Sequence, residues 1–292
     1  MLTLGVAHRA ETFERIQEPL AARDVAVEHV TASERTTRLF DPPVDASTVD
    51  VGFVFPGRVM EGGVLDALLD VPWVNGREAV LRSRNKAESL ARLDRAGLPV
   101  PDTVLVSNPV DSAELQAAFE SLSPPVVLKP NSTTRGTGVL KVSDPDSLRG
   151  ASDYLDLIHE FPATGDRSYL LQEYLPAARD LRVMVIDGEY AGAVERSLPD
   201  SARDAGRWKH NVHAGAAATA IEPDPEIREM AERAAAAMDI PFIGVDLLTT
   251  EDRVLVTETN ARPTVDDESK YVPDFYDRLA ALIRSRARSS NR

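Results

Sequence analysis

The chain has 292 residues, 43% of them hydrophobic, which is enough for about two domains with buried cores. Its formal net charge of −14 argues against a general nucleic-acid binder and against binding to an anionic membrane, because both partners require clustered Lys and Arg. The absence of cysteine excludes disulfides, thiolate metal sites and a cysteine nucleophile.

The sequence carries no sign of membrane insertion or export. No apolar run approaches the ~18 residues that span a bilayer, and the N-terminus lacks the basic-then-apolar order of a signal peptide. We therefore expect a cytoplasmic protein. Only five of the 33 basic residues are lysine, and acidic residues are dispersed along the chain, a pattern that resembles proteins of extreme halophiles. Because lysine is scarce, each lysine is a stronger functional candidate.

The first part of the chain alternates between strands and helices. Strands are predicted at residues 2–7, 24–30 and 50–57, with helices at residues 11–22 and 59–69 between and after them. This order predicts an α/β unit of about 80 residues. The glycine fingerprint of dinucleotide binding is missing after the first strand, so NAD or FAD is not expected.

A second domain is predicted to begin near Asn85. Asn85 can cap a helix, Glu88 lies three residues on, and Gly97 and Pro99 stop the helix. Further helices are predicted at 113–119, 145–158, from 224 onward and at 276–283. Further strands are predicted at 103–106, 124–130, 139–142, 168–175, 180–187 and 189–196, followed by a hairpin around 244–248 and 256–260.

The C-terminal hairpin carries a set of oxygen ligands. Glu258 and Asn260 share a face because side chains alternate along a strand, and the turn at residues 250–253 brings Asp246 within about a residue of Glu258. Two carboxylates at ~5 Å repel by roughly 3 kcal/mol at an effective dielectric of ~20, unless a cation lies between them. These oxygens suit a hard ion such as Mg²⁺ that also holds phosphates. The alternative is a solvated acidic edge hairpin.

A second candidate site is the loop between the strands at 124–130 and 139–142. Lys129 ends the first of these strands. The loop after it is rich in small polar residues and glycine, namely Ser132, Thr133, Thr134, Gly136 and Gly138. Its backbone N–H groups can turn toward phosphate oxygens while the lysine adds a point charge. The loop is not a Walker A motif, because the lysine precedes the glycines. An ordinary hairpin connection is the alternative.

The end of the strand at 168–175 is a third candidate. Gln172 and Glu173 precede a short apolar link, and Asp180 follows it. An adenine needs backbone donors and acceptors at such a hinge, and a ribose needs a carboxylate. A plain edge strand is the alternative for this segment taken alone.

Five segments in order identify a family. They read NKAESLARLDRAGLPVP, VVLKPNSTTRGTG, LLQEYLPAARDLRVMVIDGEYAGAVER, WKHNVHAGAAATAIE and GVDLLTTEDRVLVTETNARP. Over residues 84–267 the chain resembles an ATP-grasp enzyme of the RimK type. The resemblance implies an ATP-grasp fold of mixed α/β and α+β type, with a Rossmann-like N-terminal (pre-ATP-grasp) domain at 1–84 and an ATP-grasp domain at 85–288. The latter would divide into a lid-bearing subdomain at 85–171 and a metal-binding subdomain at 172–288.

The resemblance implies an ATP site at particular positions. Lys86 and Lys129 match the nucleotide-binding lysines of the family, and the loop at 131–138 would close over the phosphates. Asp180 matches the acidic residue near the ribose. The adenine hinge is matched by Gln172, Glu173, Tyr174 and Leu175.

The resemblance also implies metal and catalytic positions. Asp246, Glu258 and Asn260 match the Mg²⁺ ligands, which normally hold two ions in this family, with Mn²⁺ as an alternative ion. Three further positions would act on the transferring phosphoryl group or the acyl intermediate: Arg196, Lys209 and Asn211.

The chain departs from the family's pattern beside the expected acceptor site. After Asn260 the family usually continues toward a Pro-Gly turn, whereas this chain reads Ala-Arg-Pro-Thr at 261–264. The family's Asn-Leu-His-Arg-Gly-Gly element reads Asn-Val-His-Ala-Gly-Ala at 211–216, which loses an arginine. Both changes bear on substrate transfer and leave the ATP-binding positions intact.

The resemblance implies an ATP-dependent carboxylate-amine ligase. A substrate carboxylate would take the γ-phosphate of ATP, and an amine, such as that of glutamate, would displace phosphate to form an amide. The partners would be an amino acid and a carboxylate acceptor, either a small molecule, a coenzyme or a protein tail, and many relatives are homo-oligomers. The alternatives are a nucleotide-binding regulatory protein without turnover and a kinase that stops at phosphoryl transfer. Retention of the metal- and phosphate-binding residues favours the ligase.

Overall fold

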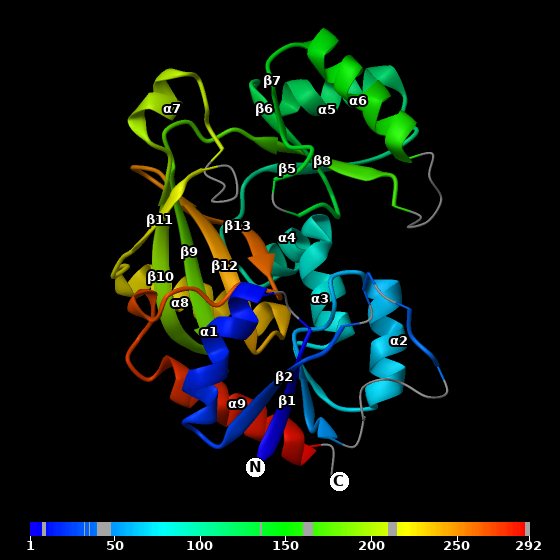
Figure 1. Cartoon of the computed structure of the whole chain (residues 1–292). Coiled ribbons are helices and arrows are strands. Elements are labelled where there is room, and N and C mark those ends of the chain that lie inside the picture. Colours follow the sequence, from blue (N-terminus) through cyan, green and yellow to red (C-terminus); the bar gives the residue numbers. More distant parts are fainter. Residues whose placement is uncertain are drawn as a thin grey trace.

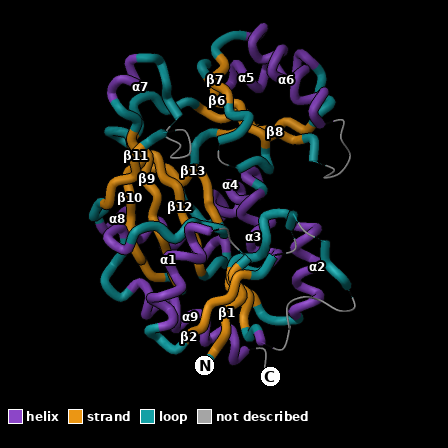
Figure 2. The backbone as a smooth tube through the Cα atoms, in the orientation of Figure 1, coloured by secondary structure: helices purple, strands orange, loops and turns teal. Residues whose placement is uncertain are grey.

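A computed structural model shows three β-sheets with helices packed on them in the described part of the chain (Figure 1). The structure describes residues 1–7, 10–31, 33–34, 36–39, 48–134, 136–159, 166–209 and 215–289. We call the sheets N-terminal, middle and C-terminal, and Figure 2 shows them as separate groups of strands. Within the described residues, no helix is long and apolar enough to cross a membrane.

The N-terminal sheet is parallel, with strand order β2-β1-β3-β4. Its strands are β1 (Leu2–Val6), β2 (Val25–His29), β3 (Val51–Phe53) and β4 (Trp73–Val74), and its helices are α1 (Ala10–Ala21), α2 (Val59–Leu69) and α3 (Arg77–Arg84). The predicted alternation of strands and helices in this part of the chain is confirmed. Strand β4 and helix α3 were not predicted, because β4 has two residues and α3, with the sequence REAVLRSR, shows little apolar periodicity.

The last helix, α9 (Phe275–Ser289), returns to the N-terminal sheet. Phe275, Leu279 and Ile283 are buried in one cluster with Leu4 and Phe53. Figure 1 accordingly shows the first strand and the last helix side by side. The predicted helix at 276–283 is confirmed and is longer in the structure.

The middle sheet is antiparallel, with order β5-β8-β6-β7. Its strands are β5 (Thr103–Ser107), β6 (Val126–Pro130), β7 (Leu140–Val142) and β8 (Ser168–Glu173), and its helices are α5 (Ser112–Ser121) and α6 (Pro145–His159). Leu128 and Leu171 are buried with both helices. Because side chains alternate along strands, Lys129 and Gln172 lie on the other face.

The C-terminal sheet is also antiparallel, with order β11-β10-β9-β12-β13. Its strands are β9 (Arg179–Ile186), β10 (Glu189–Ser197), β11 (Ala217–Ala220), β12 (Phe242–Thr249) and β13 (Val254–Asn260), and the short helices α7 (Asp200–Asp204) and η3 (Glu268–Lys270) follow β10 and β13. Leu181 and Val183 pack on the face covered by α8 (Pro225–Met238), whereas Met184 and Ile186 pack with the N-terminal sheet and α9. Asp180 and Arg182 of β9 share this second face and stand at its other end.

Helix α4 (Lys86–Arg95) connects the middle and C-terminal sheets. As predicted, the Asn85 side chain caps it and accepts a hydrogen bond from the Glu88 N–H at 3.1 Å. The helix packs against β13 and α8. Its first turn also bonds the loop after β6, because the Ala87 N–H donates to Asn131 Oδ1 at 2.9 Å. Lys86 therefore lies where the two sheets meet.

Candidate active site

One face of the C-terminal sheet carries a row of charged side chains. Cross-strand pairing places Asp246 of β12 opposite both Arg182 of β9 and Glu258 of β13. In the next row, Arg196 of β10 is opposite Asp180 of β9. Residues that are paired directly, or two apart on a strand, share a face, so all five side chains lie together. The prediction that Asp246 lies within about a residue of Glu258 is confirmed, and the two residues are paired directly.

Asp246 is held by two arginines. It is only 5% exposed, and Arg182 Nε and Nη2 donate to its Oδ1 and Oδ2 at 2.6 and 2.7 Å. Arg196 Nη2 lies 3.1 Å from Asp246 Oδ2. Burial raises the pKa of Asp246, but the two guanidinium groups outweigh burial and hold this pKa below its usual value. The carboxylate is therefore ionised before any ligand is bound.

Asp180 belongs to the same network. Arg196 Nε donates to Asp180 Oδ1 at 3.0 Å. Burial raises the pKa of Asp180 to about 6; Arg196 partly opposes this shift, whereas the charge of Asp246 adds to it. Arg196 therefore connects Asp180, which is expected near the ribose, to Asp246, which is an expected metal ligand. A ribose hydroxyl that bonded Asp180 would have to share its carboxylate with Arg196.

Lys86 links the loop after β6 to the hairpin. Its side chain is 5% exposed, and its Nζ lies 3.6 Å from Glu258 Oε1 and donates to the Thr133 carbonyl. Glu258 is more open, with 38% of its side chain exposed. Lys86 of α4 and Glu258 of β13 therefore lie next to each other beside the 131–134 loop.

Lys129 is the other buried lysine. Its Nζ donates to Gln172 Oε1 at 2.9 Å, and Gln172 Nε2 donates to Thr103 Oγ1 at 2.8 Å. Burial lowers the pKa of Lys129 to about 8, Glu258 opposes this shift and Lys86 adds to it. A neutral amide compensates a buried ammonium only in part. A bound anion would therefore stabilise the charged form of Lys129.

The loop after Lys129 requires a glycine at position 138, which is one of the loop residues singled out from the sequence. Gly138 has φ +76°, and a Cβ there would lie 2.8 Å from Pro130 Cγ. Thr133 Oγ1 donates to the Thr137 carbonyl at 2.9 Å, which folds the loop on itself. Ser132, Thr134 and Gly136 lie in the same loop, and Arg135 lies outside the described residues.

The hinge after β8 is tied to the hairpin turn. Arg253 Nη1 and Nη2 donate to the Glu173 carboxylate at 3.2 and 2.7 Å, and the Asp102 N–H donates to it at 3.0 Å. The Glu173 side chain is thus engaged with protein, so an adenine contact here would use the hinge backbone. Leu175, the last hinge position, is buried beside Leu255.

Aromatic and basic side chains gather at the other side of the hinge. The Tyr174 ring meets Trp208 edge-on, with centroids 5.8 Å apart. Lys141 Nζ lies 4.9 Å from the Tyr174 centroid, and Lys209 Nζ lies 5.7 Å from the Trp208 centroid. Burial lowers the pKa of Lys209. Asn211, expected to act with Lys209, lies outside the described residues.

The donor set on the hairpin fits a hard divalent ion. Asp246 and Glu258 supply carboxylate oxygens from paired positions, and Asn260 supplies an amide oxygen that now accepts from the Arg262 N–H at 2.8 Å. In the described part of the chain, no group of three or more His, Asp or Glu residues is placed to hold an ion. Ligation would therefore depend on the Asn260 amide and on oxygens of a bound substrate.

Arg182 and Arg253 contact the candidate site but were not predicted from the sequence. Arg182 lies two residues after Asp180 on the same strand face, and this alternation could have linked it to the candidate site. Arg253 stands in the hairpin turn, and nothing local predicts its contact with Glu173, 80 residues away in the chain.

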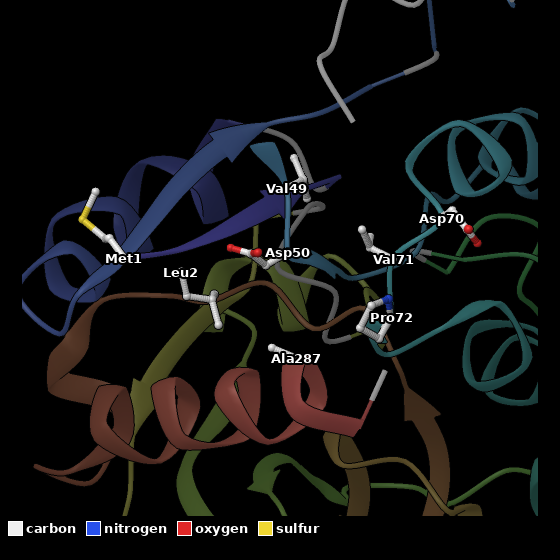
Figure 3. A pocket seen from close by; sticks show the side chains of 8 residues that line it. All are labelled: Met1, Leu2, Val49, Asp50, Asp70, Val71, Pro72 and Ala287. Atoms are coloured by element: carbon white, nitrogen blue, oxygen red, sulfur yellow. The ribbon is translucent and has the colours of Figure 1, made fainter. Parts of the chain in front are cut away.

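A pocket elsewhere does not belong to this site. It has a volume of about 480 Å³ and lies between the start of β1, the segments before β3 and β4, and Ala287 of α9 (Figure 3). None of the predicted site residues lines it.

Solved structures define the class of fold. The RimK domain ATP-grasp protein from Sphaerobacter thermophilus DSM 20745 matches with a TM-score of 0.70 and 22% identity, over 97% of this chain and 99% of that one. The D-alanine–D-alanine ligase from Bacillus anthracis, complexed with ATP, matches with a TM-score of 0.68 and 17% identity, over 99% and 98% of the two chains. The fold is therefore an ATP-grasp fold, as predicted.

Sequence comparison defines the family. The model of the RimK-like ATP-grasp domain matches residues 83–280. A probable alpha-L-glutamate ligase of Stenotrophomonas maltophilia (strain K279a) is 30% identical over 191 residues, which are 65% of this chain and 61% of that protein. A probable alpha-L-glutamate ligase of Hydrogenovibrio crunogenus (strain DSM 25203 / XCL-2) is 31% identical over 221 residues, 75% and 69% of the two chains. The chain belongs to the RimK-like ATP-grasp family, whose members use ATP and typically Mg²⁺.

Proposed function

We propose that the protein is an ATP-dependent carboxylate-amine ligase that joins an amino acid, such as glutamate, to a carboxylate acceptor through an acyl phosphate. The observation that carries the proposal is the convergence of cations and carboxylates from three elements. Lys86 of α4 lies 3.6 Å from Glu258 of β13, and Glu258 is paired with Asp246 of β12. The names of the glutamate ligases to which the chain is similar support the choice of amine.

The proposed domain division follows the predicted boundaries. An N-terminal domain at 1–84, a lid-bearing subdomain at 85–171 and a metal-binding subdomain at 172–288 each hold most of one sheet. Helix α4 begins the second of these segments, yet it packs against β13 and α8 of the third. We propose that α4 acts as the fixed support on which the middle sheet moves.

The nucleotide would lie between the middle and C-terminal sheets. Lys129 and Lys86 would neutralise phosphate oxygens, and the 131–138 loop would donate backbone N–H groups to them. The adenine would bond the backbone at Gln172 to Leu175, because the Glu173 carboxylate is engaged by Arg253. Closure of the loop would exclude water from the acyl phosphate.

Asp246, Glu258 and Asn260 would hold Mg²⁺, in our proposal two ions, which would neutralise charge on the phosphates. Arg182 and Arg196 already bind the Asp246 carboxylate. We propose that these guanidinium groups turn toward the transferring phosphoryl group when the carboxylate accepts a metal. Because their charge is retained within the site, they would stabilise the acyl phosphate until the amine attacks its carbonyl carbon and phosphate leaves.

The experiment is a screen for ADP release at high salt with pooled carboxylates and amino acids, followed by mass spectrometry of each hit. A carboxylate and an amine together should stimulate ADP release and give an amide. Asp246→Ala and Glu258→Ala should abolish the release, and the exposed Glu251→Gln in the same hairpin should not. ADP release that survives both alanine substitutions would contradict the proposal.

Two other outcomes separate the alternatives. A phosphorylated product that is stable to added amines would identify a kinase. Binding of Mg-ATP with no product from any carboxylate would identify a regulatory protein.

A further inference from the structure

An aromatic and basic cluster beside the hinge joins two parts of the chain. Tyr174 lies directly after β8, and its ring meets the Trp208 ring edge-on, with the centroids 5.8 Å apart. The Nζ of Lys141, in β7, lies 4.9 Å from the Tyr174 centroid and 5.9 Å from the Trp208 centroid. Both distances are within the ~6 Å over which a cation and an aromatic ring attract each other. We call Lys141, Tyr174 and Trp208 the hinge cluster.

The middle sheet places Lys141 in this cluster. Lys141 is paired with Val127 of β6, which lies two residues before Lys129 on the same strand. Lys141 and Lys129 therefore share the face of the sheet that is turned away from α5 and α6. Lys141 is thus held on the same surface as an expected nucleotide-binding lysine.

Trp208 belongs to the C-terminal part of the chain, in the segment between α7 and β11. It directly precedes Lys209, a residue expected to act on the transferring phosphoryl group. Lys209 Nζ lies 5.7 Å from the Trp208 centroid, so the indole contacts one ammonium from each part of the chain. Burial lowers the pKa of Lys209, and a phosphate would stabilise its charged form. The position of the indole therefore affects where Lys209 can reach.

The contact of Lys141 with two rings has a plain alternative, because lysine stems often cover apolar surface while the ammonium stays in water. Two observations favour a role in the site. The ammonium itself lies within range of both ring centroids. The more distant of these rings, Trp208, is adjacent in sequence to Lys209. The cluster therefore links the sheet face that carries Lys129 to the segment that carries Lys209.

We propose that Lys141 is a positioning residue that, through Trp208, holds Lys209 within reach of the γ-phosphate of ATP. This inference rests on the proposed ligase function. When the nucleotide binds, Lys141 remains on the indole, and Lys209 exchanges the ring for the phosphate. Strand β7 of the middle sheet therefore sets the position of a cation that belongs to the other side of the nucleotide site.

The test measures the preference for a γ-phosphate and needs no turnover. Calorimetry compares the affinity of the protein for a nonhydrolysable ATP analogue with its affinity for ADP, both with Mg²⁺. Lys209→Gln should reduce this preference by about tenfold, because a charged hydrogen bond is lost. Lys141→Gln should reduce it by about threefold, the scale of one cation–π contact at an exposed site. Lys141→Arg, which keeps the contact between cation and ring, should restore the preference.

Double-mutant cycles separate positioning from a direct effect of the Lys141 charge. Trp208→Leu removes the ring without changing the charge, and it should lower the preference as Lys141→Gln does. In a Trp208→Leu or a Lys209→Gln background, Lys141→Gln should have no further effect, because the residues act through one another. Arg149→Gln, in α6, removes an exposed positive charge of the same subdomain and should leave the preference unchanged.

Fluorescence reports on the hinge cluster before any nucleotide is added. The chain has two tryptophans, so Trp73→Phe leaves Trp208 as the one source of indole fluorescence. In that background, Lys141→Gln should increase the quenching of Trp208 by acrylamide, and Lys141→Arg should not. Thermal unfolding checks the fold of each variant. The Lys209→Gln background decides the cycle where Trp208→Leu does not fold.

The outcomes separate this inference from the proposed function. Absence of binding by the ATP analogue would count against the ligase, and against this inference with it. Where the analogue binds, an unchanged preference in Lys141→Gln would overturn the positioning role alone. A loss of the same size in the Lys209→Gln background would also overturn it, because Lys141 would then act without Lys209.

Discussion

The middle and C-terminal sheets bring buried charge to the same site in opposite ways. On the C-terminal sheet, Asp246 is bound by the guanidinium groups of Arg182 and Arg196, which hold its pKa low despite burial. On the middle sheet, Lys129 donates to the neutral amide of Gln172, and burial lowers its pKa to about 8. The difference supports our proposal that the carboxylate side is stabilised within the protein, whereas the lysine side would be stabilised by a bound anion.

Removal of the charge of Asp246 should have the largest effect. Asp246→Asn takes away an expected metal ligand and leaves Arg182 and Arg196 with a weaker partner. We expect ADP release to fall by about three orders of magnitude, the scale seen when a key electrostatic group is lost from an active site. Glu251→Gln is the control. Wild-type turnover in Asp246→Asn would show that the arginine network is only structural.

Lys129→Met should separate stability from binding. The substitution removes a buried cation whose pKa is lowered, so the free energy of unfolding should rise. Affinity for Mg²⁺ and an ATP analogue should fall by about a hundredfold, because a charged hydrogen bond of about 1.5–3 kcal/mol is lost. Thermal unfolding and calorimetry measure the two quantities. A less stable variant with unchanged affinity would contradict the comparison of the two sheets.

The pH dependence should follow from the same lysine. Its pKa in the folded protein is about 8, below the ordinary value of 10.5, so the unfolded chain binds more protons between these values. The contribution of Lys129 to the free energy of unfolding therefore rises as pH increases from about 8 to 10.5. Phosphates favour the charged lysine, so nucleotide affinity should weaken above about pH 8.

Calorimetry in buffers of different ionisation enthalpy should detect proton uptake on nucleotide binding near pH 8.5. The same titration on Lys129→Met should show less uptake. Equal uptake in both proteins would assign the proton to another group.

Arg253→Gln should have the smallest effect. The substitution breaks the contact between the hairpin turn and Glu173, but about half of the Arg253 side chain is exposed, and exposed ion pairs contribute little. We expect a change of a few-fold in nucleotide affinity that shrinks as salt rises. Arg92→Gln, in an exposed pair within α4, is the control and should leave affinity unchanged.

Local patterns were enough to predict much of the fold and part of the candidate site. The Asn85 cap, the approach of Asp246 to Glu258 and the position of Lys129 at a strand end each follow from patterns within a short stretch of the chain. The expected roles of these residues in ligand binding stay predictions.

Contacts between distant segments were not predictable in the same way. In the sequence, Arg182 has the pattern of an ordinary exposed strand residue. Its contact with Asp246 can be predicted only when the register of β9, β12 and β13 is known. The packing of α9 on the N-terminal sheet depends on residues that are far apart in the chain. The apolar periodicity of α9 predicts a buried face but does not predict which sheet covers it.

The packing of α9 against β1 also bears on how the protein is made. The ribosome delivers Leu4 long before Leu279 and Ile283, yet all three are buried in one cluster. The N-terminal sheet thus keeps apolar surface open to solvent until α9 has been synthesised. Nascent chains that stall before α9 should therefore expose that surface to chaperones.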